Sequence, residues 1–218
     1  MELTKKSDRL GQDKIKSLLF KLSFPAIVGM LIQSLYNIID SIYIGRLSTE
    51  ALSALTLCFP IQMVLISLGV GTGVGASSLI SRLLGRGNTK RAGNVAEHVF
   101  FIAIIYGIVV SFVGIFFAED IMHLFTDNSS LIGLGLRYLR IILIGSIAIF
   151  MPVTFNYILR GEGNTFLPML TMLIGAITNI ILDPFIIFGI GWFPKLGIEG
   201  AAYATVFSRL LGGIFITL

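Results

Sequence analysis

Residues 99–117, VFFIAIIYGIVVSFVGIFF, form an apolar run without a single charged side chain. A helix needs about 20 such residues to cross the roughly 30 Å of hydrocarbon in a bilayer. Further apolar runs of similar length lie on both sides of this one. We therefore expect an all-α membrane protein with six transmembrane helices, at residues 20–44, 55–80, 95–117, 137–157, 166–190 and 198–218.

The composition supports this fold class. Of the 218 residues, 55% are hydrophobic and 13% are charged, whereas a soluble domain carries about 25% charged residues. The 17 Phe residues and the aliphatic runs exclude a disordered chain. The single cysteine, Cys58, excludes a disulfide framework. The net charge of +4 comes largely from a basic N-terminus, which favours a membrane flank, and we expect no nucleic-acid partner.

Lysine and arginine residues indicate the orientation, because they concentrate in cytoplasmic loops. With the N-terminus inside, the inner segments contain Lys5, Lys6, Arg9, Lys14, Lys16, Lys21, Arg82, Arg86, Lys90, Arg91 and Arg160. The outer segments then contain Arg46, Arg137, Arg140 and Lys195. This bias predicts a cytoplasmic segment at residues 1–19, followed by a six-helix transmembrane lobe at residues 20–218.

Four polar residues fall at one depth of the predicted bundle. Charged side chains inside a membrane are costly and usually functional. At 1.5 Å per residue, Asp40, Asn179, Asp183 and Thr205 all lie on the order of 5–12 Å below the outer surface. Two carboxylates, an amide and a hydroxyl suit a small hard cation such as Na⁺, or a proton. The alternative is that these side chains only join neighbouring helices.

Two prolines inside predicted spans are candidate hinges. Pro184 leaves the carbonyl of Ile180 without its helical partner, which offers another oxygen beside the candidate cation site. Pro25 does the same to the carbonyl of Lys21 and predicts either a bend between two states or a static kink. Arg209 lies deeper, and the sequence leaves open whether it extends towards the inner surface or pairs across the bundle.

The residues do not suggest an enzyme or a cofactor site. The serines lack a histidine at matching depth. The strongest enzyme alternative is intramembrane proteolysis by Asp40 and Asp183, but a proline directly follows the second acid. Four alternate glycines at positions 69–75 lie in an apolar span without a following Lys-Ser/Thr, so they favour helix packing over phosphate binding.

Five segments resemble the multidrug and toxic compound extrusion (MATE) family. They are LYNIIDSIYIG at 35–45, ISRLLGRGNTKRA at 80–92, LRGEGNTFLPML at 159–170, TNIILDPFIIFGIG at 178–191 and GIEGAAYATVFSR at 197–209. They follow in order along essentially the whole chain.

The resemblance implies a fold and a function. Members have twelve helices in two lobes, so this chain would be the N-terminal lobe, with a C-terminal lobe missing after Leu218. The family exports cationic and amphipathic drugs across the inner membrane in exchange for Na⁺ or H⁺. Its cation site is similar to Asp40, Asn179, Asp183 and Thr205, and it adds Tyr138 and Asn156 as candidate residues of the substrate cavity.

Three alternatives remain open at this point. A complete six-helix protein would need no second lobe. A lipid-linked saccharide flippase of the same superfamily would be expected to carry more intramembrane arginine and lysine for an anionic lipid. A structural or regulatory membrane fragment without transport activity would give Asp40 and Asp183 no function.

Overall fold

A computed structural model describes residues 15–217, and these residues are almost entirely helical. The predictions for the first fourteen residues, including four of the inner basic residues, lie outside the described part. The helices are α2 (Ile15–Gly45), α3 (Thr49–Gly85), α4 (Thr89–Phe116), α5 (Ala118–His123), α6 (Ser129–Ile144), α7 (Ile147–Gly161), α8 (Phe166–Phe188) and α9 (Ile198–Thr217).

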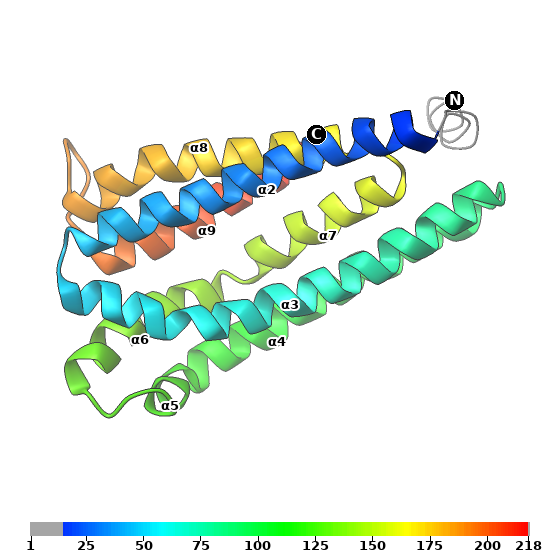
Figure 1. Ribbon diagram of the computed structural model, residues 1–218. Coiled ribbons are helices and arrows are strands. Elements are labelled where there is room, and N and C mark those ends of the chain that lie inside the picture. Colours follow the sequence, from blue (N-terminus) through cyan, green and yellow to red (C-terminus); the bar gives the residue numbers. More distant parts are fainter. Residues whose placement is uncertain (1–14, 218) are drawn as a thin grey trace.

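The long helices run side by side as a bundle (Figure 1). Helix α8 packs against both α2 and α9, and α7 packs against α3 and α4. The turns at 86–88 and 162–165 lie at the same end of the bundle as the start of α2 (Figure 1). The turn at 46–48, helix α5 and the segment 189–197 lie at the opposite end. The loops thus alternate between two ends, as a multi-pass protein requires.

Four of the six predicted spans are helices long and apolar enough to cross a membrane. They are Leu19–Gly45, Thr49–Gly85, Thr89–Phe116 and Phe166–Phe188. The first three of these extend beyond the predicted limits at one or both ends. Helix α9 begins at the predicted residue. Within the described part of the chain, however, it is not among the helices that are long and apolar enough to cross a membrane. The sixth span and the orientation of the N-terminus therefore stay predictions.

The predicted fourth span, residues 137–157, is broken. Helices α6 and α7 meet at an angle of 51° across Gly145 and Ser146. The Ser146 hydroxyl donates to the carbonyl of Gly107 (2.9 Å), and the Ser111 hydroxyl donates to the carbonyl of Ile144 (2.8 Å). A Cβ at Gly145 would lie 2.5 Å from Val206, so the close approach of α9 requires glycine there. The Ser111 hydroxyl thus supplies a donor to a carbonyl at the end of α6, and the Ser146 hydroxyl joins the break to α4.

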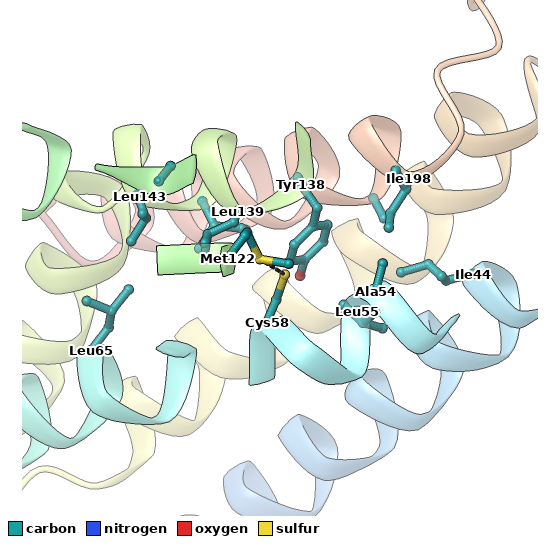
Figure 2. Packing of buried hydrophobic residues seen from close by; sticks show 14 of the residues in the cluster. Ile44, Ala54, Leu55, Cys58, Leu65, Met122, Tyr138, Leu139, Leu143 and Ile198 are labelled. Atoms are coloured by element: carbon teal, nitrogen blue, oxygen red, sulfur yellow. Dashed lines mark hydrogen bonds between the residues drawn. The ribbon is translucent and has the colours of Figure 1, made fainter. Parts of the chain in front are cut away.

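The hydrophobic core lies between α3, α6 and α9, near the end of the bundle that contains α5. Figure 2 shows Cys58, Met122 and Tyr138 meeting in this cluster. The thiol of Cys58 lies 3.9 Å from the sulfur of Met122, and both side chains are completely buried. Many large apolar side chains on α2 and α4 are exposed instead, among them Phe24 and Phe112. Such surfaces are expected where lipid or another membrane helix covers the protein.

Candidate functional site

Helix α8 brings Asn179 and Asp183 together because residues four apart share one face of a helix. The Asn179 amide nitrogen donates to a carboxylate oxygen of Asp183 (3.2 Å). The same nitrogen lies 3.5 Å from the hydroxyl of Thr205 on α9. Asp183 is fully buried and Asn179 is 1% exposed. Three of the four residues of the predicted cation site are thus connected across two helices.

Asp40 is the fourth residue, and it is buried on α2, which packs against α8. Its carboxyl lies within electrostatic range of Asp183. Among the described residues, no hydrogen bond joins Asp40 to Asn179, Asp183 or Thr205. The structure places all four residues in the bundle interior, but it connects only the last three by hydrogen bonds.

The site contains buried oxygen atoms without hydrogen-bond partners. They are one carboxylate oxygen of Asp40, the amide oxygen of Asn179 and one carboxylate oxygen of Asp183. Buried polar atoms in proteins are nearly always paired, so each of these needs an explanation. Unpaired oxygens of this kind fit Na⁺, because hard cations prefer carboxylate and carbonyl ligands. A proton on one of the carboxyl groups is the other possibility.

A cavity of about 250 Å³ lies beside this site. Its wall is formed by residues of α2, α3, α6, α7, α8 and α9. Thr205 and Asn156 line it, whereas Tyr138 does not. The ring of Tyr138 packs in the hydrophobic core, and its hydroxyl lies 3.5 Å from Gln62, which does line the cavity.

Two arginines in the cavity wall were not identified as site residues from the sequence. Arg209 donates a hydrogen bond to the hydroxyl of Tyr36 (2.6 Å), and its guanidinium lies 5.4 Å from the centre of that ring. This answers the open question about Arg209, since it pairs across the bundle with α2. Arg160 was counted only as an inner-loop base, yet its guanidinium lies in the cavity wall, 5.1 Å from the centre of the Tyr157 ring.

The sequence contained a partial signal for these residues. Tyr36 lies four residues before Asp40, and Arg160 lies four residues after Asn156, so each shares a helix face with a predicted site residue. The sequence could not show that α9 lies close enough to α2 for Arg209 to reach Tyr36. That contact joins residues 173 positions apart.

Comparisons with known proteins agree with the fold. An FAD transporter of Shewanella oneidensis is 34% identical over 90% of this chain and 44% of its own length. A probable multidrug resistance protein of Bacillus subtilis is 32% identical over 85% of this chain and 40% of its own length. The chain thus spans less than half the length of these relatives.

A solved structure of a MOP superfamily transporter from Pyrococcus furiosus superposes with a TM-score of 0.89 and 35% identity. The match covers 96% of this chain and 45% of that one. The MatE family model matches residues 25–185. Members of this family are multi-pass inner-membrane transporters and not enzymes, which confirms the predicted class and localisation. The chain belongs to the MatE family of multidrug and toxic compound extrusion transporters.

Proposed function

We propose that this chain is the N-terminal lobe of an antiporter that exports small amphipathic molecules in exchange for Na⁺ or H⁺. The observation that carries the proposal is the set of three buried, unpaired oxygen atoms on Asp40, Asn179 and Asp183. Leaving such atoms unpaired in a membrane interior is costly, and a bound cation or proton removes that cost.

Coupling needs the ion and the substrate to favour different arrangements of the lobe. Helix α2 is the candidate moving element, because it carries Asp40 and also contributes Met30, Tyr36 and Asn37 to the cavity wall. A bend of α2 at Pro25 would therefore change the cation site and the cavity together. Binding a cation at Asp40 and Asp183 would favour one of the two shapes.

The nature of the substrate is supported only in broad terms. Several relatives are named as multidrug export or resistance proteins, and the Shewanella oneidensis relative is named as an FAD transporter. The proposed substrates are therefore small organic molecules that combine apolar and polar parts. The wall supports this class, because aromatic and aliphatic side chains lie there beside amides and hydroxyls. A second lobe would complete the transport path.

The test is substrate export by vesicles that contain the protein as the cell makes it, driven by an imposed Na⁺ or H⁺ gradient. Asp40→Asn and Asp183→Asn preserve shape but remove the charge that holds the cation. Each should abolish ion-driven export at near-normal expression. Asp120→Asn, which removes an exposed acid on α5, is the matched control and should export normally.

Export at the wild-type rate by either well-expressed site variant would remove that aspartate from coupling. Normal export by both variants would refute the proposed coupling site. A radioactive Na⁺ uptake measurement on the same vesicles separates the two ions. If Na⁺ uptake accompanies export and depends on Asp40, Na⁺ is the coupling ion. If a pH gradient drives export without Na⁺, H⁺ is the coupling ion.

A further inference from the structure

We propose that the cavity binds an amphipathic organic anion, whose carboxylate or phosphate group is held by Arg160 and Arg209. This inference rests on the proposed transport function and specifies the substrate class. It differs from the organic cations that the sequence resemblance implied.

The first argument is the charge of the cavity wall. Arg160 and Arg209 are the charged residues among the described side chains that line the cavity, and no carboxylate lines it. Asp40 and Asp183 are buried behind the wall. Among the described residues, neither arginine has a carboxylate within salt-bridge distance. Both guanidinium groups therefore present positive charge to the cavity without a protein counter-ion.

The second argument is that the arginine side chains have unused donors. Among the described residues, the guanidinium of Arg160 donates no hydrogen bond, so its terminal N–H groups are unused, and its buried Nε atom has no partner either. Arg209 uses one terminal nitrogen on Tyr36, and a guanidinium has five N–H donors. A carboxylate or phosphate accepts such donors in pairs. An uncompensated cation inside a membrane protein is costly, and an anionic ligand supplies the missing charge.

The third argument concerns the rest of the ligand. Both guanidinium groups lie against tyrosine rings, Tyr157 and Tyr36, which hold them in place. Phe59, Met63 and the aliphatic residues of α3 provide an apolar wall in the same cavity. A ligand that fits these surfaces has an apolar body and one anionic end. The charges divide accordingly, since the aspartates face the coupling cation and the arginines face the substrate.

The test uses three probes that share one aromatic body: pyrenebutyrate, pyrenebutanol and a pyrenebutyl trimethylammonium salt. Binding is measured by fluorescence titration of the purified protein, as the cell makes it, in nanodiscs of zwitterionic lipid without an ion gradient. The wild-type protein should bind the anion at least about tenfold more tightly than the alcohol, because a guanidinium bonds strongly to an anion. The cation should bind most weakly. Equal affinities, or tighter binding of the cation, would overturn the proposal.

Variants then assign the residues. Arg160→Gln and Arg209→Gln should each weaken the binding of pyrenebutyrate by about tenfold and leave the binding of pyrenebutanol nearly unchanged. Arg140→Gln removes an exposed arginine of α6 that lies outside the cavity and should change neither probe. Equal losses for the acid and the alcohol would mean that the arginines only support the shape of the cavity. The wild-type comparison of probes decides the proposal even if a variant fails to fold.

Two further arms separate the source of the anion and the two proposals. In nanodiscs that contain phosphatidylglycerol, the lipid should weaken the binding of pyrenebutyrate if a lipid headgroup is the natural anion. It should leave that binding unchanged if the natural anion is a soluble molecule. Both results support an anion site. Asp40→Asn should keep the preference for the anion while it loses ion-driven export. Failure of coupling is therefore seen in transport, and failure of the anion site is seen in binding.

Discussion

Asn179 uses a single amide group to hold two other polar side chains. Its nitrogen donates to Asp183 and approaches Thr205, while its oxygen remains unpaired. This arrangement keeps one oxygen of Asp183 occupied and leaves the other free for a cation. The residue therefore fixes the orientation of the neighbouring carboxylate, and under the proposed function its own oxygen is a ligand of the cation.

Asn179→Ala should weaken cation binding about tenfold or more, because it removes a hydrogen bond to a charged group and one candidate ligand. The measurement is the Na⁺ or H⁺ concentration that gives half-maximal export. Thr205→Val is the comparison variant and should have a smaller effect, since a contact of 3.5 Å is at the limit of a hydrogen bond. Equal losses in both variants would contradict the central role of Asn179.

Contacts between individual residues could be predicted where the chain itself fixes the geometry. Asn179 and Asp183 are four residues apart on one helix, so their contact followed from spacing alone. Thr205 was placed by depth, and α9 does bring it to Asn179. Tyr138 was placed in the cavity only through the family resemblance, but its ring packs in the core. The roles of Arg160 and Arg209 depend on how closely α2, α7 and α9 approach one another, which no local pattern encodes.

At the scale of elements, the least expected feature is the break between α6 and α7. The predicted span 137–157 was continuous by hydropathy, which does not register a break filled by apolar and small residues. The break is stabilised from outside, by the hydroxyl of Ser111 on α4 and by the packing of Gly145 against α9. Hydropathy predicted which segments form long apolar helices, and tertiary contacts decided where one of these segments bends.

Ser111→Ala tests this account of the break. It removes the hydrogen bond that the carbonyl of Ile144 accepts and should lower the free energy of unfolding by about 1–3 kcal/mol. The measurement is thermal or denaturant unfolding of the protein in detergent. Ser67→Ala is the matched control, because the Ser67 hydroxyl only bonds to the Met63 carbonyl within its own helix. A loss in Ser67→Ala as large as in Ser111→Ala would show that the break does not depend on α4.

At the scale of the whole molecule, charge and fold give consistent but different information. The bundle places the turns at 86–88 and 162–165 at one end and residues 117–128 and 189–197 at the other (Figure 1). The excess of lysine and arginine falls on the first of these ends. The fold fixes which loops share a side, whereas only the charge bias predicts which side faces the cytoplasm.

Cysteine labelling in intact cells tests that orientation. The two end regions contain Gly87 and Asn128, but neither suits a cysteine substitution, because Gly87 has a φ of +72° and the Asn128 side chain accepts hydrogen bonds from two backbone N–H groups of α6. Lys90 and Asp127 are exposed alternatives in the same two regions. In a Cys58→Ala background, a membrane-impermeant maleimide should label Asp127→Cys from outside and label Lys90→Cys only after the cells are permeabilised. The reverse pattern would invert the orientation, and would place the cation site near the cytoplasmic surface instead of the outer one.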